Sequence, residues 1–441
     1  MRQRFLLPLS NRKGHYGRGL TEHMYDLAIK NGLCFIDREF VECNIGINGN
    51  KIAYVGKSDI RGEIEINAAN MFVLPGLFNA HTHAAMTLFR GYAEGLPLRQ
   101  WLEKVWEVEA KLNEDAVYWG SMLACLEMLK SGVTAFADMY IHMDGVAEAV
   151  GETGIRAIIG YGMADRGNVE RAEKELEIAL EVISKWNGSF GGRLRCMLTP
   201  HAPYTCSPEF LRRIAEIGRE KNLVKHIHLS ETLWEVREIK KQFGVRPAEL
   251  LDSLGFLDDK TVVAHAVWLS DEEISVLAKK GVSVAHCPTS NLKLSSGVAR
   301  VTEMIESGIN LSIGTDGAAS NNMLCVMSEV RTAALLQSLR RKVVRTSDWL
   351  RAATENGYRA YGFKGGRIST GMLADVTIFQ KNFRHYPLHD PASLIFVENC
   401  EAYHVIVNGE LIVEEGIVLP LDEEKVLKKV ENVKERLFGH G

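Results

Sequence analysis

The sequence lacks the features that define disulfide-stabilised or membrane-spanning proteins. Its eight cysteines include no C-x-x-C pair, which argues against both a disulfide framework and a zinc knuckle. No apolar run approaches the ~20 residues that span a bilayer, and the apolar part of "MRQRFLLPLS" is too short for a signal peptide. We therefore expect free thiols in a reducing cytoplasm and no membrane partner.

A strong charge of one sign is also missing. The net charge is -4 and the pI is about 6.4, so electrostatics give no reason to expect nucleic acid as a partner. A chain of 441 residues is too long for one small core, and its length predicts two to three domains, or one large α/β barrel with a smaller unit. These numbers leave the oligomeric state open, and a homo-oligomer is one alternative.

The two ends of the chain differ from its middle. Residues 1–23 are basic and without periodicity, and we interpret them as an N-terminal extension or as residues that precede a translation start at Met24. Residues 24–74 and 375–441 both contain short strand patterns with Asn-Gly turns. We predict one small β-sandwich built from both chain ends, followed by a C-terminal helix.

Residues 75–374 alternate short apolar runs with amphipathic stretches of helical period. Alternation of this kind predicts a parallel sheet, and eight strand candidates predict an α/β fold of the (β/α)8 TIM barrel type. An open doubly wound sheet is the alternative. The strand candidates, each with the turn that follows it, are 72–83, 133–140, 155–165, 194–205, 223–231, 261–269, 282–290 and 310–317.

Polar side chains stand at the carboxyl ends of these strands, where barrel enzymes carry their chemistry. His81 and His83 end the first strand, and side chains two residues apart on a strand share a face, so both can bind one metal ion. The other polar residues at strand ends are His201, His228, Glu231, His265, His286 and Asp316.

One histidine at a strand end is more often an ordinary hydrogen-bonding residue than a ligand. We interpret His226, two residues deeper than His228, and His286 as supporting residues, and His142 as a loop residue. A set of imidazoles with one carboxylate and no thiolate suits Zn²⁺ best, with Fe²⁺ or another divalent transition metal as alternatives. Glu231 is the candidate proton carrier.

Six motifs in order along the chain carry a family resemblance. They are "PGLFNAHTHAAMTLFRGYAE", "TPHAPYTCS", "HIHLSET", "VVAHAVWLS", "HCPTSNLKLSSG" and "IGTDGAASNN". The chain resembles the amidohydrolase superfamily, in particular its deaminase and chlorohydrolase branch, and most closely the 5-methylthioadenosine/S-adenosylhomocysteine deaminases. The resemblance extends from about Tyr25 into the C-terminal segment.

The resemblance implies one metal ion held by His81, His83, His228 and Asp316, with His265 hydrogen-bonded to the metal-bound water. Members with two metal ions carry a carboxylated lysine at the end of strand 4, and "LTPHAPYT" has none. We therefore expect one Zn²⁺ per subunit, and the missing lysine argues against a binuclear amidase.

The implied reaction is hydrolytic deamination at C6 of an adenine ring, which gives the inosine analogue and ammonia. Glu231 would protonate ring N1 while Asp316 and His265 accept protons from the attacking water. His201 would contact the purine or ribose. Glu109 would accept hydrogen bonds from the ribose hydroxyls, although a solvated helix residue is an equal alternative.

The expected substrates are small nucleosides: methylthioadenosine, 5-deoxyadenosine and adenosine. Relatives that accept S-adenosylhomocysteine have arginines near the end of strand 3, where this chain has Tyr161. Arg166 and Arg171 are the nearby substitutes, so use of S-adenosylhomocysteine is an open question. Alternative functions are a related hydrolase acting on guanine or a triazine ring and, much less favoured, a metal-free scaffold.

Overall fold

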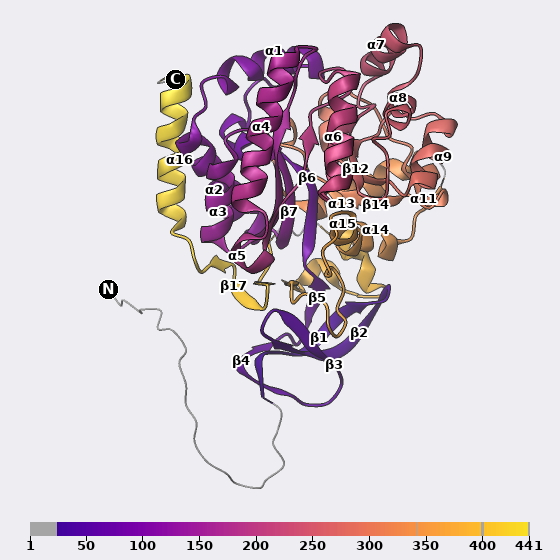
Figure 1. Cartoon of the computed structure of the whole chain (residues 1–441). Helices are drawn as coiled ribbons and strands as arrows, with labels where there is room; N and C mark the ends of the chain where they lie inside the picture. The colour runs from indigo at the N-terminus through magenta and orange to yellow at the C-terminus, as the bar shows by residue number, and fades with distance from the viewer. Residues whose placement is uncertain (1–23, 341, 398–400, 440–441) are drawn as a thin grey trace.

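The computed structural model describes residues 24–340, 342–397 and 401–439, so the expectation for residues 1–23 lies outside the described residues. Figure 1 shows a body of alternating strands and helices above a smaller β unit. The expected α/β organisation is confirmed, and the two ends of the chain meet in the smaller unit as predicted.

The smaller unit is a single sheet of nine hydrogen-bonded strands in the order β18-β17-β16-β15-β5-β1-β2-β3, with β4 paired to β1. Antiparallel pairing of β5 with β15 joins the N-terminal and C-terminal strands directly, as expected of a unit built from both chain ends. The strands are β1 (Met24–Ile36), β2 (Glu39–Asn48), β3 (Lys51–Gly56), β4 (Arg61–Asn67), β5 (Met71–Pro75), β15 (Val376–Gln380), β16 (His404–Val407), β17 (Glu410–Glu414) and β18 (Ile417–Val418).

The Asn-Gly turn predicted near the C-terminal end forms, whereas the Asn31-Gly32 pair lies inside β1, where it accompanies a shift of pairing register instead of a turn. Asn408 and Gly409 connect β16 to β17 with φ of 56° and 83°, and positive φ at both central residues is what a two-residue hairpin turn requires. In β1 the pairing register with β2 shifts between Ile29 and Gly32. Because of this bend, the first half of β1 pairs with β4 and the second half with β5.

The larger unit contains a strand at each of the eight predicted positions. They are β6 (Leu77–Thr82), β7 (Val133–Tyr140), β8 (Arg156–Met163), β9 (Leu194–Cys196) with β10 (Thr199–Pro200), β11 (Lys225–Leu229), β12 (Thr261–His265), β13 (Ser283–His286) and β14 (Asn310–Ile313). The fourth predicted strand is therefore two short strands. All pairings among these strands are parallel.

These strands form two sheets, β10-β8-β7-β6 with β9 on β8, and β11-β12-β13-β14. Backbone hydrogen bonds connect the two sheets on both sides. Leu198 donates to Val224 at 2.9 Å and accepts from His226 at 2.8 Å, while Asp316 donates to the His81 carbonyl at 2.9 Å. The ends of β6, β11 and the segment after β14 are thus brought close together.

Helices surround these strands, and α16 lies along one side of the body (Figure 1). The predicted C-terminal helix is α16, which Lys130 of α2 binds through Glu423 at 2.7 Å. The helices are η1 (Ala84–Phe89), α1 (Leu98–Glu109), α2 (Glu114–Lys130), α3 (Met143–Thr153), α4 (Val169–Trp186), α5 (Ser189–Gly192), α6 (Pro208–Glu220), α7 (Leu233–Phe243), α8 (Pro247–Ser253), α9 (Asp271–Lys280), α10 (Pro288–Lys293), α11 (Val301–Glu306), α12 (Ala318–Asn321), α13 (Val326–Ser338), α14 (Thr346–Ala353), α15 (Glu355–Ala360), η2 (Phe383–His385), η3 (Pro391–Phe396) and α16 (Glu423–Phe438).

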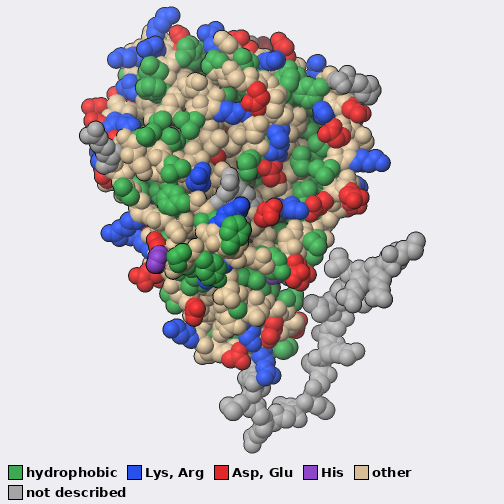
Figure 2. Space-filling view, turned by 180° about the vertical axis from the view of Figure 1, so that it is seen from behind, with side chains coloured by type: hydrophobic (Ala, Val, Ile, Leu, Met, Phe, Trp, Pro, Cys, Tyr) green, Lys and Arg blue, Asp and Glu red, His purple; other side chains and the backbone are tan. Residues whose placement is uncertain are grey.

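The surface carries charges of both signs, and the described helices lack long apolar runs, as the composition predicts. Figure 2 shows basic and acidic side chains mixed with apolar ones over the face seen from behind. Among the described residues, no helix combines the length and the apolar character needed to cross a membrane.

Candidate active site

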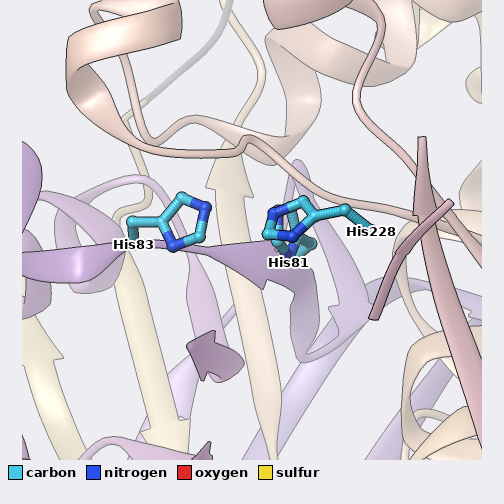
Figure 3. A group of neighbouring side chains, drawn as sticks. All are labelled: His81, His83 and His228. Atoms are coloured by element: carbon cyan, nitrogen blue, oxygen red, sulfur yellow. The ribbon is translucent and has the colours of Figure 1, made fainter. Parts of the chain in front are cut away.

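Three imidazoles gather where strands of the two parallel sheets end. His81 and His83 come from the end of β6 and His228 from β11, and one ring nitrogen of each lies within 4.8 Å of the others. A second group within the same limit consists of His81, His265 and Asp316. Figure 3 shows the three side chains gathered at this place, and the ring centroid of His81 lies 4.9 Å from that of His83 and 4.9 Å from that of His228. The residues singled out at strand ends therefore meet at one point.

Backbone carbonyls set the orientation of two of these rings. Nδ1 of His83 lies 2.6 Å from the Met139 carbonyl oxygen, and Nδ1 of His228 lies 2.7 Å from the His201 carbonyl oxygen. A carbonyl only accepts hydrogen bonds, so Nδ1 carries the proton in both rings. Nε2 is therefore the nitrogen of each ring that is available to a metal ion, which is the arrangement that a metal-binding histidine needs.

In His81, too, the proton lies on Nδ1, but here other side chains fix it. Nδ1 of His81 lies 2.8 Å from Nε2 of His226, and Nδ1 of His226 lies 3.2 Å from the Tyr361 hydroxyl. That hydroxyl donates to the carbonyl of Ala80, so His226 donates to Tyr361 and accepts from His81. His81 Nε2 is buried and has no hydrogen-bond partner in the described part of the chain.

Asp316 completes the cluster on the side of β14. Its Oδ1 lies 3.5 Å from His81 Nε2 and 3.3 Å from His83 Nε2. Its Oδ2 accepts hydrogen bonds from the hydroxyls of Ser290 at 2.6 Å and Ser320 at 2.7 Å. Burial alone would raise the pKa of Asp316, but the neighbouring imidazoles of His81 and His83 outweigh it and hold the pKa well below 3.8.

The carboxylate of Asp316 attracts positive charge into the cluster. Burial lowers the pKa of both neighbouring imidazoles. At His81 burial dominates, and the pKa falls to about 4. At His83 the interaction with Asp316 more than offsets burial, and the pKa rises to about 9. The cluster is therefore electrostatically suited to a cation.

Glu231 and His265 lie at the edge of the cluster. Oε2 of Glu231 is 3.9 Å from Nε2 of His265, and its Oε1 accepts a hydrogen bond of 3.0 Å from the Ser296 hydroxyl. Nδ1 of His265 donates to the Asn291 side-chain oxygen at 2.8 Å, so its Nε2 is directed toward the glutamate. Burial raises the pKa of Glu231 above 4.5, which makes its protonated form more accessible near neutral pH.

A cavity of about 310 Å³ opens beside the cluster. The sequence-predicted residues that line it are His83, Glu109, His201, His228, Glu231, His265 and Asp316. His81 is fully buried behind them. Among the predicted catalytic, substrate-binding and metal-binding residues, His81 alone does not line the cavity, and it belongs to the histidine cluster.

Glu109 lies in the cavity wall at the end of α1, half-buried, instead of in solvent. Burial raises the pKa of its carboxyl, and the neighbouring Tyr140 hydroxyl acts in the opposite direction. His201 lies further along the wall, with its Nδ1 3.0 Å from the Thr205 hydroxyl. Burial lowers the pKa of His201 to about 3, so its ring is neutral.

A larger outer chamber of about 910 Å³ adjoins this cavity. The residues that line both are Leu98, Leu102, Trp106, Arg166, Tyr204, Thr205 and Leu294. The guanidinium of Arg166 lies over the Trp106 ring at 5.2 Å. Arg171 lines the inner cavity and donates to Glu175 at 3.2 Å.

Tyr161 lies away from both chambers, in a separate depression beside Lys185. Burial and the carboxylate of Glu175 raise its pKa to about 12. The residue that stands in place of an expected arginine therefore does not face the histidine cluster.

Sequence reasoning assigned no role to several residues that hold the site together. Ser290, Asn291 and Ser296 each hydrogen-bond a predicted site residue. The sequence did indicate hydrogen-bonding residues at this place, because all three lie in the Ser- and Asn-rich segment "TSNLKLSS" after β13. Asp138 was also missed; its Oδ1 accepts from the Ala84 N–H at 2.7 Å, and burial raises its pKa to about 7.

Comparison with known proteins agrees with this geometry. The model of the amidohydrolase family matches residues 72–412. A 5-methylthioadenosine/S-adenosylhomocysteine deaminase 2 from Archaeoglobus fulgidus is 64% identical over 416 residues, 94% of this chain and 100% of that protein. A 5'-deoxyadenosine deaminase from Methanocaldococcus jannaschii is 42% identical, with 89% of this chain and 96% of that protein covered.

Solved structures show the same fold. An adenosine deaminase from Xanthomonas campestris with bound zinc superimposes with a TM-score of 0.89 at 30% identity, covering 94% of this chain and 99% of that one. An atrazine chlorohydrolase from Arthrobacter aurescens in complex with zinc gives a TM-score of 0.87 at 25% identity, covering 92% of this chain and 100% of that one.

The chain belongs to the amidohydrolase family and, within it, to the 5-methylthioadenosine/S-adenosylhomocysteine deaminases, as its motifs indicated. Its donor set also fits a divalent metal. The site consists of the buried Nε2 of His81, which has no hydrogen-bond partner among the described residues, the Nε2 atoms of His83 and His228, and the carboxylate of Asp316. It contains no thiolate, and such sites favour zinc or a related transition metal.

Proposed function

We propose that the chain is a metal-dependent hydrolytic deaminase that converts 5'-substituted adenosines to inosine analogues and ammonia. The observation that carries the proposal is the cluster of His81, His83, His228 and Asp316 beside a cavity lined by Glu231 and Glu109. The similarity to two deaminases of such nucleosides supports it. The complete donor set argues against a metal-free scaffold.

We assign one Zn²⁺ per subunit to this cluster, with Fe²⁺ or another divalent metal as the alternative. His81, His83, His228 and Asp316 would hold it, since each offers a donor atom on the same side of the cluster. When bound, zinc supplies a nucleophile at neutral pH because it lowers the pKa of water to about 7.

Glu231 would hold a proton and deliver it to ring N1 of the adenine. Burial raises its pKa, and it lines the cavity with Oε2 3.9 Å from His265 Nε2. Addition of water at C6 makes N1 more basic, so a carboxylic acid at this position is suitably matched to the transfer. N1 keeps this proton in the inosine product, so the attacking water supplies two others: one would go to the leaving amino group, which departs as ammonia, and one would return to the Glu231 carboxylate.

Asp316 and His265 would accept the proton that the attacking water releases. Asp316 has a low pKa, so it is ionised at neutral pH and can accept a proton only transiently. His265 has Nδ1 bound to Asn291, which leaves Nε2 as the acceptor. The two groups face the cavity from the ends of β12 and β14, with β13 between these strands.

Glu109 and His201 would bind the nucleoside. Glu109 offers two acceptor oxygens to a vicinal diol, and its place in the cavity wall fits the ribose side. The neutral ring of His201 can donate or accept one hydrogen bond toward the purine or ribose.

The outer chamber would receive the 5'-substituent. Its walls are partly aromatic, from Trp106, Tyr204 and Trp234, which suits a methylthio group. Arg166 lines both chambers and is the candidate partner for a carboxylate, so the deaminase could accept S-adenosylhomocysteine although Tyr161 lies elsewhere.

We also propose that the strands of residues 75–374 close into a (β/α)8 barrel. The hydrogen bonds from Leu198 to Val224 and from Asp316 to His81 support closure at both edges. The chain would then have two domains. Residues 24–74 and 375–441 would form the small β-sandwich with its C-terminal helix, and residues 75–374 would form the barrel. Localisation to the cytoplasm and the oligomeric state stay predictions.

Loss of adenine absorbance in zinc-loaded protein tests the activity. The panel is methylthioadenosine, 5'-deoxyadenosine, adenosine and S-adenosylhomocysteine, with guanine and a chlorotriazine as controls. We expect conversion of the small adenosines. Turnover of only guanine or the triazine would replace the proposal by the related ring hydrolase.

A further inference from the structure

Glu235 is fully buried yet is not among the residues that line either chamber. It lies in the first turn of α7, and its Oε1 accepts from the Ser230 N–H at 2.8 Å while its Oε2 accepts from the Glu231 N–H at 2.9 Å. The two carboxylate oxygens of Glu235 therefore bind the main chain of the two residues that follow β11, and the second of these is the proposed proton carrier Glu231.

Ordinary helix capping does not account for this arrangement. The sequence Thr232-Leu-Trp-Glu235 has the spacing of a capping box, in which the glutamate would return to the backbone N–H of Thr232. Thr232 does cap the helix, accepting from the Glu235 N–H at 3.2 Å. The Glu235 carboxylate instead reaches past it to Ser230 and Glu231.

The segment that Glu235 binds has an unfavourable backbone. Ser230 has a φ of 49°, a left-handed conformation that a residue with a Cβ adopts only when its surroundings hold it there. Two adjacent N–H groups converging on one carboxylate provide such a constraint. On the opposite side, the Ser230 carbonyl accepts from the Trp268 N–H at 2.9 Å.

These contacts form a closed circuit around Glu231. The indole N–H of Trp268 donates to the Ser296 carbonyl at 2.6 Å, and the Ser296 hydroxyl donates to Glu231 Oε1 at 3.0 Å. Glu231 is thus held at its main chain by Glu235 and at its carboxylate by Ser296.

We propose that Glu235 is a positioning residue, which holds Ser230 in its left-handed conformation and thereby aims the Glu231 carboxylate into the active-site cavity. The inference rests on the proposed deaminase function, because it assigns Glu235 an effect through the proton carrier.

The test is a double-mutant cycle on zinc-loaded protein with methylthioadenosine. Glu235→Gln keeps the side-chain shape but turns an NH₂ group toward a backbone N–H. Because misplacing a catalytic group by about 1 Å costs roughly 10²-fold, we expect kcat to fall about 10- to 100-fold, with KM changed less than about twofold and zinc content unchanged. In a Glu231→Gln background the same substitution should lower the residual kcat by less than about threefold.

Glu238→Gln, on the same helix and paired only with Lys241 at 3.8 Å, is the matched control and should behave as wild type. Equal loss from Glu235→Gln in both backgrounds, or a kcat within twofold of wild type, would overturn the inference. If Glu235→Gln does not fold, Ser296→Ala removes the hydrogen bond that holds the Glu231 carboxylate from the other side. It should give the same loss of kcat in the wild-type background and the same small loss in the Glu231→Gln background.

A crystal structure of the Glu235→Gln protein supplies a readout that does not depend on turnover. We expect Ser230 to relax to negative φ and the Glu231 carboxylate to leave Ser296; an unmoved Glu231 would overturn the inference. Wild-type protein that binds zinc but converts no adenosine would instead remove the proposed function, while this structural comparison would still decide the positioning role.

Discussion

Two carboxylates occupy the same active site in opposite surroundings. Asp316 faces two imidazoles and accepts hydrogen bonds from Ser290 and Ser320. Glu231, after β11, accepts one hydroxyl hydrogen bond and is 3.9 Å from the nearest imidazole nitrogen. The pKa of Asp316 is held low, whereas burial raises that of Glu231.

This difference separates the roles that two carboxylates can take at neutral pH. A carboxylate surrounded by donors stays ionised and can bind a metal, whereas one that burial has made less acidic can carry a proton to substrate. The contrast supports the proposed roles of Asp316 at the metal and of Glu231 at the adenine ring. The first two predictions below each test one side of the contrast, and the other two concern the residues around it.

Removing the charge of Asp316 should have the largest effect. We expect Asp316→Asn to lose bound metal and to lower kcat/KM by more than about 10³-fold, because the change removes both a ligand and a proton acceptor. Zinc content and turnover measured together check it. Asp271→Asn, the same change at an exposed residue paired with Arg300, should leave both unchanged.

Glu231→Gln should separate the two roles. We expect zinc to be retained and kcat to fall by about 10²- to 10⁴-fold, the usual contribution of a positioned acid or base. The measurements are metal analysis and steady-state kinetics on the same preparation. Loss of zinc from this variant would show that Glu231 belongs with the metal ligands, and the contrast would fail.

Glu109→Gln should act on binding and leave proton transfer intact. Losing a charged hydrogen-bond acceptor for the ribose should raise KM about 10-fold with little change in kcat. A nucleoside without the 2'- and 3'-hydroxyls provides the control, since wild type and variant should handle it equally. A kcat loss of the size expected for Glu231→Gln would contradict the assignment.

His286 should have the smallest effect, and only in acid. Burial lowers its pKa from 6.5 to about 3, so the unfolded chain binds a proton that the folded chain does not. Stability from this group is complete above pH 6.5 and is lost as the pH falls toward 3. At pH 5 the loss is at most about 2 kcal/mol.

His286→Asn should therefore lose less stability between pH 7 and pH 5 than wild type does. Chemical denaturation at both pH values measures the difference. Identical losses in the two proteins would show that His286 does not contribute to the acid sensitivity.

Much of this site follows from sequence because barrel-like α/β folds bring strand ends together. His81, His228, Glu231, His265 and Asp316 could be selected from their positions after apolar runs, and the family resemblance added the role of His265 toward the metal-bound water. The carbonyls of Met139 and His201 that orient the ligand rings could not be found this way, because every residue has a carbonyl and only the fold selects one.

The remaining differences have equally physical reasons. The order of the nine strands, with β5 beside β15, could not be predicted from the sequence, since alternation along a strand predicts its faces but not which strand lies beside it. The break between β9 and β10 is also invisible in an apolar run. The environment of Tyr161 depends on Glu175, which lies 14 residues further along the chain on another element, α4.

A crystal structure of the zinc-loaded protein with a purine ribonucleoside that lacks the 6-amino group tests the central contrast most directly. Without its leaving group this ligand should stay in the site. We expect ring N1 within about 3.2 Å of a Glu231 oxygen and Asp316 at the metal. A complex with N1 directed away from Glu231, or with Glu231 on the metal, would contradict the separation of roles.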